Sequence, residues 1–135
     1  MVPIFCIDYL IKSIDRKSFL LLKRKDEPLK GEWWLPGGRL QMHESFKFAQ
    51  KRILKREIGV NLSVDSQAKL IGISNYMFPA NSQKKAVHTP TITFLISSED
   101  EFNVNIGHCH EEARWAKELP GFFLKNINLV DPFHR

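Results

Sequence analysis

The chain contains few cysteines and no long hydrophobic run, and these two absences exclude several classes of protein. Its 135 residues include only two cysteines, Cys6 and Cys109, which lie far apart and do not indicate a disulfide framework. No stretch approaches the ~18 to 20 apolar residues of a membrane-spanning helix. The apolar N-terminal segment is interrupted by Asp8 and has no basic leader, so it predicts a strand and not a signal peptide. We therefore expect a reduced, cytoplasmic protein without a membrane partner.

The sequence also lacks low-complexity and disordered segments. Hydrophobic residues make up 43% of the chain, which is enough to build a buried core. A chain of this length fits one domain. We predict a single domain spanning residues 1–135.

The charge balance is basic, with a formal net charge of +5 and a pI near 9.3. Such a balance favours an anionic ligand. Apart from Lys23-Arg24-Lys25 and a lysine-rich helical segment, the basic residues are scattered, and no zinc-finger or helix-turn-helix pattern is present. A small nucleotide explains the charge at least as well as nucleic acid does, and we expect no nucleic-acid partner.

Residues 31–60 organise the rest of the chain. Bulky residues at 33–35 predict a strand, and Pro36-Gly37-Gly38 breaks it. A helix is predicted from about 44 to 58, with Gly59 as its C-terminal stop. One side of this helix is apolar except for its last member, and it is formed by Phe46, Ala49, Ile53 and Glu57. A carboxylate in that stripe needs a cation, a hydrogen-bond donor or a metal to offset its desolvation.

This stretch resembles the Nudix box, which is Gly, five residues, Glu, seven residues, then Arg-Glu-apolar-x-Glu-Glu-x-Gly-apolar. The positions that match in register are Gly38, Glu44, Arg52, Leu54, Glu57, Gly59 and Val60. The fixed spacing makes the match far more specific than a lone glycine motif. Ile53 and Arg56 stand where the family usually has metal-binding glutamates, so Glu57 is left as the one helix carboxylate of the Arg-Glu-apolar-x-Glu-Glu segment.

The two replacements have two interpretations. One is a decayed box on a domain that only binds nucleotides. The other is a subgroup that needs one metal, and the GDP-mannose mannosyl hydrolases resemble this chain in that respect. The resemblance extends outside the box to Lys23-Arg24, Gly31-Glu32-Trp33, Pro36-Gly37-Gly38-Arg39, Gln41 and His110-Glu111-Glu112-Ala113-Arg114-Trp115.

The resemblance implies an α/β fold, the Nudix α/β/α sandwich with a mixed β-sheet and the box helix on one side. The second flanking helix would then be short or supplied late in the chain. The remaining strands are predicted at 3–13, 18–25, 60–64, 69–76, 88–97 and 113–119. In the first of them the side chains alternate between two faces, and Asp8 is the odd member of its row. Residues 78–87 are predicted to form a loop of about ten residues that rims the ligand pocket. Residues 122–135 show no clear helical pattern.

The resemblance also implies a set of site residues. Glu57 and the backbone carbonyl of Gly37 are expected to bind one Mg²⁺, or Mn²⁺, per active site. Arg24 and Arg39 are expected to hold the diphosphate, which suits the planar, bidentate guanidinium. Asp8 is expected in the sugar site, although an ordinary buried partner would explain it as well. Glu44 and Arg52 are predicted to form a structural ion pair.

The segment 107–112 contains two histidines around Cys109, and a zinc site is one interpretation. Its weakness is that Cys6 is the only other cysteine and no CxxC or HxxxH partner is present. The alternative is that a loop presents His110 as a general base with an ordinary pKa near ~6.5. His110 is favoured over His108 because it aligns with the subgroup's His-acidic-acidic-x-Arg-Trp run. Cys109 replaces the metal-binding Gln of that subgroup.

The reaction implied is Mg²⁺-dependent hydrolysis of a nucleotide-diphosphate sugar, GDP-mannose to GDP and mannose, by attack of water at the anomeric carbon. His110 takes the proton, with Arg24 and Asp8 completing the catalytic set, and a homodimer is expected. Two alternatives stay open. One is an ordinary Nudix pyrophosphohydrolase that acts at phosphorus on nucleoside diphosphate derivatives, and the other is a non-catalytic nucleotide-sensing Nudix domain.

Overall fold

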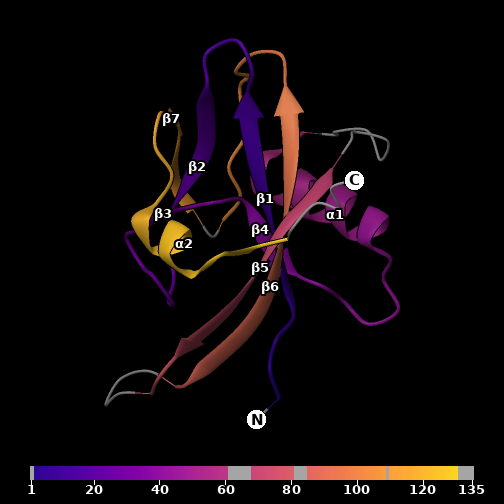
Figure 1. The fold of residues 1–135 in the computed structure, drawn as a ribbon, viewed down its shortest axis with the longest axis vertical. Coiled ribbons are helices and arrows are strands. Elements are labelled where there is room, and N and C mark those ends of the chain that lie inside the picture. Colours follow the sequence, from indigo (N-terminus) through magenta and orange to yellow (C-terminus); the bar gives the residue numbers. More distant parts are fainter. Residues whose placement is uncertain (1, 61–67, 81–84, 109, 131–135) are drawn as a thin grey trace.

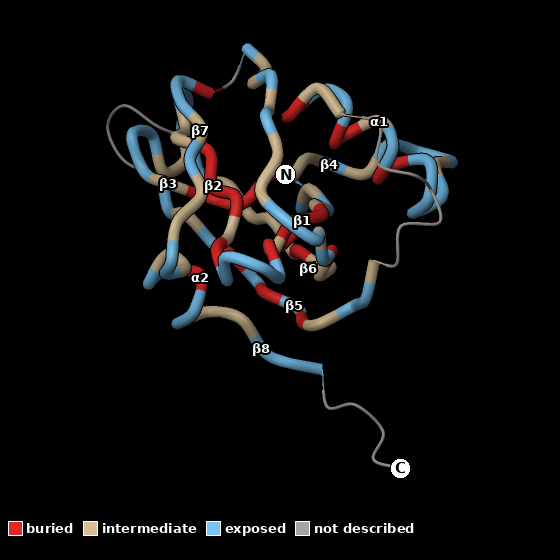
Figure 2. Tube along the Cα trace, turned by 90° about the horizontal axis from the view of Figure 1, so that it is seen from above, coloured by how far each residue is buried: buried red, intermediate tan, exposed pale blue. Residues whose placement is uncertain are grey.

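The computed structural model describes residues 2–60, 68–80, 85–108 and 110–130. In chain order, the elements are β1 (Cys6–Ser13), β2 (Ser18–Arg24), β3 (Trp33–Trp34), β4 (Gly37–Arg39), α1 (Phe46–Ile58), β5 (Lys69–Phe78), β6 (Val87–Ser98), β7 (His110–Ala116), α2 (Gly121–Asn126) and β8 (Asn128–Leu129). Figure 1 shows the long β5–β6 hairpin rising from the lower left, with the arrowhead of β6 beside that of β1 at the top. In the view from above, α1 and α2 lie on opposite sides of the strands (Figure 2).

The strands form one mixed sheet. Its main order is β3-β2-β1-β6-β5-β8, while β4 pairs with β1 and β7 pairs with β2. The β1–β6 pair is parallel, and the pairs that β1 forms with β2 and β4 are antiparallel. This confirms the predicted α/β/α sandwich with a mixed sheet, in which α2 is the short second helix.

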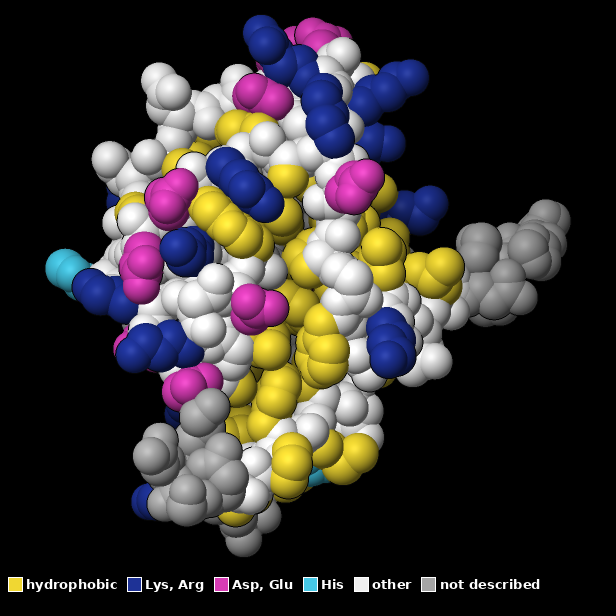
Figure 3. All heavy atoms as spheres, turned by 90° about the vertical axis from the view of Figure 1, so that its left-hand side faces the viewer, with side chains coloured by type: hydrophobic (Ala, Val, Ile, Leu, Met, Phe, Trp, Pro, Cys, Tyr) yellow, Lys and Arg dark blue, Asp and Glu magenta, His cyan; other side chains and the backbone are white. Residues whose placement is uncertain are grey.

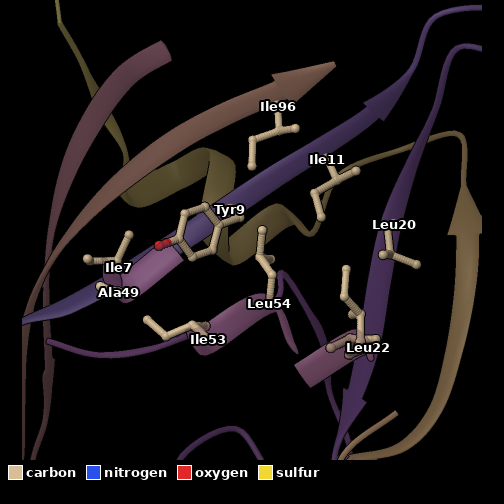
Figure 4. Close-up of a cluster of buried hydrophobic side chains, with 10 residues drawn as sticks. Ile7, Tyr9, Ile11, Leu20, Leu22, Ala49, Ile53, Leu54 and Ile96 are labelled. Carbon is tan, nitrogen blue, oxygen red and sulfur yellow. The ribbon is translucent and has the colours of Figure 1, made fainter. Parts of the chain in front are cut away.

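Strand β1 lies at the centre of the sheet, and its alternating side chains enter two separate cores. Ile7, Tyr9 and Ile11 pack beneath α1 with residues from β2 and β6, as the close-up in Figure 4 shows. Leu10 points to the opposite face and packs with the aromatic residues next to α2. Asp8 shares that second face and is buried. The alternation predicted from the sequence is therefore confirmed, with Asp8 as its polar member.

Helix α1 begins and ends at recognisable capping residues. The hydroxyl of Ser45 accepts a hydrogen bond from the Phe48 backbone N–H, 3.2 Å away, which satisfies one of the free donors at the start of the helix. Gly59 ends the helix in the left-handed region, with φ of 72°, where a residue without a Cβ is favoured. The helix thus begins slightly later than the sequence predicted and ends where expected.

Several predicted boundaries were wrong. Strand β5 continues to Phe78 and β6 begins at Val87, so the expected loop at 78–87 is shorter than predicted, and its residues 81–84 lie outside the described part. The late segment contains α2 and β8, although its sequence shows no helical period. A helix of six residues is too short to reveal one. Most of the strand predicted at 60–64 lies outside the described residues.

The helices in the described ranges are too short or too polar to cross a membrane.

Candidate active site

A cavity of about 400 Å³ opens at one end of β1 and is lined by residues from almost every strand and from α1. One end of the cavity is ionic and carries the predicted site residues, namely Asp8, Arg24, Gly37, Arg39, Glu57 and His110, together with Arg56. The other end is apolar and contains Trp34, Tyr76 and Phe78. The fold therefore brings all the predicted site residues together around one cavity.

Strand β4 positions the ionic end through two glycines. Gly37 pairs with Asp8 in the β1–β4 ladder, and a Cβ on Gly37 would collide with Asp8 Oδ1 and lie 2.6 Å from the Ile7 carbonyl oxygen. A Cβ on Gly38 would lie 2.5 Å from Nη2 of Arg56. The sequence predicted a turn here, but the segment is a short strand. The glycines are required because β1 and α1 approach the backbone closely.

Glu57 extends from the last turn of α1 into this cavity and is almost completely buried. Its Oε1 accepts a hydrogen bond from the Gly37 N–H at 3.5 Å and lies 3.6 Å from Nε2 of His110. Its Oε2 lies 3.7 Å from Nε of Arg56. Burial raises the pKa of Glu57, and the positive charge of Arg56 opposes that shift. The carboxylate is thus placed by contacts that are all long for charge-assisted hydrogen bonds.

Asp8 is the second buried carboxyl group of the site. Burial raises its pKa to about 7, while a hydrogen bond from the indole N–H of Trp34 to Oδ2, at 3.3 Å, acts in the opposite direction. The positive charge of Arg24 also favours the charged form, and the negative charge of Glu57 disfavours it. Asp8 therefore has both the ordinary buried partner that the sequence allowed and a place in the cavity wall.

Arg24 is brought to the site by an irregularity in the sheet. The β2–β7 register shifts between Lys23 and Arg24, and this shift sets Arg24 opposite His110. A β-bulge next to a site redirects a side chain in this way. The Arg24 guanidinium donates from Nε to the carbonyl oxygen of Pro28 at 2.6 Å. Its charge lowers the pKa of His110 and favours ionised Glu57 and Asp8, so Arg24 acts on all three groups.

The two histidines near this site differ completely in their surroundings. His108 is exposed, whereas His110 is the buried first residue of β7 and lies on the strand instead of the loop predicted for it. Burial, together with the charges of Arg24 and Arg56, lowers the pKa of His110 to about 4. The expected value near 6.5 was therefore too high. At neutral pH His110 is an uncharged base, and its buried Nδ1 has no hydrogen-bond partner among the described residues.

The cysteine environment does not favour the zinc interpretation. Burial, together with the neighbouring charge of Asp8, raises the pKa of the Cys6 thiol to about 11, so the thiolate that zinc requires is disfavoured. Within the described ranges, no three His, Cys, Asp or Glu side chains form a metal-binding group. Cys109, which the sequence places at a lost ligand position, lies outside the described residues.

Arg39 and the Glu44–Arg52 pair lie where the sequence predicted. Arg39 pairs with Cys6 at the end of β4 and is exposed at the cavity wall. Arg52 donates from Nε to Glu44 Oε2 at 2.6 Å and from Nη2 to Glu44 Oε1 at 2.8 Å. Its Nη2 also donates to the Arg39 backbone oxygen at 2.9 Å. The predicted structural ion pair is confirmed, and it fixes β4 to α1.

The two replaced glutamate positions have different roles in the structure. Ile53 is completely buried in the core beneath α1, where a carboxylate would have no water. Arg56 instead reaches the cavity and lies against Gly38. The sequence interpretation missed Arg56 as a site residue because adjacent positions on a helix normally point about 100° apart. Its signals were its position next to Glu57 and its place where the family usually has a metal-binding glutamate.

The apolar end of the cavity is built from aromatic rings. Tyr76 packs edge-on against Trp34 at 5.6 Å and stacks on Phe122 of α2 at 5.7 Å, and Phe78 lies beside both Tyr76 and Phe122. Figure 3 shows a strip of hydrophobic side chains down the middle of the face that carries β2, β7 and α2. Trp34, Tyr76 and Phe78 give the cavity a wall suited to an apolar or aromatic ligand group.

Two of the sequence runs used in the resemblance meet in space. Arg114 of β7 stacks its guanidinium over the ring of Trp33 in β3, with 4.2 Å to the ring centre. Strand β2 lies between them, because it pairs with β3 and β7. These two residues therefore support the sheet that carries Arg24 and do not line the ionic cavity.

The donor groups fit a hard divalent cation such as Mg²⁺. Mg²⁺ prefers oxygen ligands and is usually held by one or two carboxylates, several waters and the phosphates of a substrate. Glu57 is a buried carboxylate with long contacts, Asp8 is a neighbouring carboxyl group, and the Gly37 backbone lies between them. The described part of the chain offers no full cage of protein carboxylates, and substrate phosphates would complete the coordination.

Comparison with known proteins places the chain in a family. The model of the NUDIX domain matches residues 9–118. An ADP-ribose pyrophosphatase from Methanocaldococcus jannaschii is 32% identical over 125 residues, which are 93% of this chain and 64% of that protein. The low-salt glycan biosynthesis protein Agl8 of Haloferax volcanii is 33% identical over 66 residues, 49% of this chain and 41% of that protein. The chain therefore spans less than two thirds of either relative.

A solved structure agrees with this placement. The MutT NUDIX hydrolase from Burkholderia pseudomallei superposes with a TM-score of 0.72 at 25% identity, and the match covers 89% of this chain and 88% of that one. The family model and the structural superposition thus agree with each other. The chain belongs to the NUDIX domain family.

Proposed function

We propose that this Nudix chain hydrolyses a nucleoside diphosphate sugar, with GDP-mannose to GDP and mannose as the preferred reaction. Attack occurs at the anomeric carbon of the sugar, and the nucleoside diphosphate is the leaving group. The observation that carries the proposal is the composition of the ionic cavity end. It contains one helix carboxylate, Glu57, facing an uncharged histidine and three arginines.

This composition suits stabilisation of a departing diphosphate. Arg24, Arg39 and Arg56 are cations that line the same cavity, and a diphosphate that leaves the sugar gains negative charge in the transition state. Guanidinium groups bind phosphate oxygens through paired N–H donors. The family resemblance to the one-metal subgroup agrees with the loss of the carboxylates at Ile53 and Arg56.

His110 is the general base in this reaction. Its imidazole is uncharged at neutral pH, because its pKa is lowered to about 4 mainly by burial. It accepts the proton of the attacking water, while the β2 bulge that sets Arg24 opposite His110 keeps the base and the diphosphate clamp together. Asp8, held by Trp34, contacts the sugar from the floor of the cavity. A general base of this kind contributes about 10² to 10⁴ in rate.

Glu57 and the backbone of Gly37 would hold the Mg²⁺ or Mn²⁺ ion. When bound, the ion neutralises charge on the diphosphate as a Lewis acid. The protein's part is to keep the Glu57 carboxylate charged although it is buried. The charge of Arg56 and the hydrogen bond from the Gly37 N–H both favour this charged form.

The second candidate is pyrophosphohydrolysis, with attack at phosphorus. It is favoured by the similarity to the ADP-ribose pyrophosphatase, which extends over 93% of this chain. ADP-ribose is itself a nucleoside diphosphate joined to a sugar, so both candidates require the same two cavity ends. They differ in which bond breaks.

The test is a product analysis in ¹⁸O-labelled water. The protein is incubated with MgCl₂ and either GDP-mannose or ADP-ribose, and products are identified by mass spectrometry. Labelled mannose with unlabelled GDP supports the proposal. GMP with mannose 1-phosphate, or AMP with ribose 5-phosphate, with the label in a phosphate group, establishes the second candidate. No turnover of either compound, with binding retained, identifies a nucleotide-sensing domain and ends both.

A further inference from the structure

Arg56 directs its guanidinium into the active-site cavity from an unusual position. It precedes Glu57 on α1, and neighbouring helix positions do not normally face each other. Its Nε nevertheless lies 3.7 Å from Glu57 Oε2, and its Nη2 lies against the backbone of Gly38. The guanidinium therefore spans the narrow gap between α1 and β4, at the carboxylate expected to bind the metal.

Of the two side chains in this contact, Arg56 is exposed to solvent and Glu57 is buried. The Glu57 side chain is 5% exposed, whereas the Arg56 side chain is 51% exposed. Their separation exceeds the 2.7–2.9 Å of a formed charge-assisted hydrogen bond. The carboxylate is thus fixed in the protein, while the guanidinium is half in water and is able to move. Its charge favours ionised Glu57 against the effect of burial.

We propose that the positively charged Arg56 side chain lies beside Glu57 in place of the metal ion and competes with the divalent cation for the Glu57 carboxylate. Once the cation has displaced it, the Arg56 guanidinium binds the substrate diphosphate. The identity of that anion rests on the proposed function. The competition for Glu57 does not, because it depends only on the two charges and the carboxylate between them.

Electrostatics links the two parts of this proposal. A single carboxylate cannot balance both a guanidinium and a divalent cation, so the two repel each other in the free protein. A diphosphate supplies the missing negative charge and is bound by the fork-shaped guanidinium and the metal together. Arg24 is tied to the Pro28 carbonyl oxygen by its Nε, whereas the Arg56 guanidinium lies beside Glu57 itself and is placed to exchange partners there. Metal and nucleotide should therefore bind cooperatively.

The test measures Mn²⁺ binding to the whole protein without substrate. Free Mn²⁺ is followed by its electron paramagnetic resonance signal during titration of wild type, Arg56→Gln and Lys55→Gln. Lys55→Gln removes the same charge from the same helix turn, but Lys55 is exposed and does not line the cavity. Binding of ADP and GDP is then measured by calorimetry with and without Mn²⁺.

We expect Arg56→Gln to bind Mn²⁺ about two- to tenfold more tightly than wild type, as expected from removal of one partly screened repulsive charge. It should bind ADP and GDP about tenfold more weakly in the presence of Mn²⁺, because a charged hydrogen-bond donor is lost. Lys55→Gln should match wild type in both measurements.

Unchanged or weaker Mn²⁺ binding by Arg56→Gln, or no Mn²⁺ binding by either protein, overturns the competition. Equal tightening in Lys55→Gln also overturns it, since the effect would then be one of net charge. Retained nucleotide affinity in Arg56→Gln overturns the diphosphate contact. If wild type hydrolyses no nucleotide sugar but Arg56→Gln tightens Mn²⁺ binding, the proposed function fails and the competition stands, so the two failures are distinguishable.

Discussion

Two arginine–glutamate pairs involve α1, and their construction differs. Arg52 reaches back to Glu44 in the preceding loop and closes a fork of two hydrogen bonds of 2.6 and 2.8 Å. Arg56 approaches Glu57 to only 3.7 Å at the cavity. The hydrogen bond from Arg52 lowers the pKa of Glu44 to about 2, whereas burial raises the pKa of Glu57. The Glu44 carboxylate is thus fully hydrogen-bonded to its arginine, whereas the Glu57 carboxylate has only a long contact with its arginine.

This difference separates a structural pair from a functional one. A satisfied carboxylate gains little from a further cation, so Glu44 is suited to hold β4 against α1. A buried carboxylate with only long contacts has a strong tendency to take up a cation or a proton. We therefore propose that the metal binds Glu57 and not Glu44, and the following variants test that proposal.

The largest effect is expected for Glu57→Gln. The amide keeps the size of the side chain but removes the charge that would hold the metal, so metal-dependent turnover should fall by at least about 10³. The fold should survive, because burial already disfavours the charged form of Glu57. Steady-state assays over a range of MgCl₂ and circular dichroism check both expectations. Full activity at ordinary Mg²⁺ concentrations would remove Glu57 from the site.

His110→Gln should have the next largest effect, a fall in turnover of about 10² to 10⁴ with little change in substrate affinity. Its matched control is His108→Gln, which should be nearly neutral because His108 is exposed. An essential His108 beside a dispensable His110 would show that the base has been assigned to the wrong histidine.

The pH profile sharpens the assignment of His110. Because its pKa is lowered to about 4, the base form is present above that pH and is lost only as the pH falls through about 4. His110 should therefore contribute no limb near ~6.5 to the wild-type profile, and any limb near pH 7, where Asp8 titrates, should persist in His110→Gln. Rate measurements on both proteins in overlapping buffers check this, and a limb near 6.5 that disappears in His110→Gln would contradict the lowered pKa of His110.

Glu44→Gln should change stability more than chemistry. It removes the charged partner of Arg52 and should lower Tm by a few degrees at pH 7, with turnover reduced far less than by Glu57→Gln. The pKa of Glu44 falls from 4.5 to about 2 on folding, so the ion pair stabilises the protein above about pH 4.5 and loses its effect as the pH falls towards 2. The difference in Tm between variant and wild type should shrink over that range. A constant difference would show that the charge of Glu44 is not its cause.

Much of the fold and of the site follows from local patterns. The alternation in β1, the end of α1 at Gly59 and the Glu44–Arg52 pair were predicted correctly, because each depends on residues close in sequence or on the fixed spacing of the box. The resemblance implied a short or late second helix, but the residues of α2 and β8 were not located from the sequence, since segments of six and two residues have no measurable period. Their position is set by packing of Phe123 and pairing with β5.

The sequence by itself determined the family and the box helix, and it predicted most of the charged residues that gather around the cavity. Only the tertiary structure decided their states: that His110 is buried and uncharged, how far Asp8 resists ionisation, and that Arg56 reaches the cavity. The physical reason is that a pKa and an ion pair depend on desolvation and on distances between segments remote in sequence. Strands β1, β4 and β7 meet the end of α1 only in the folded chain, and there His110 and Glu57 come within 3.6 Å.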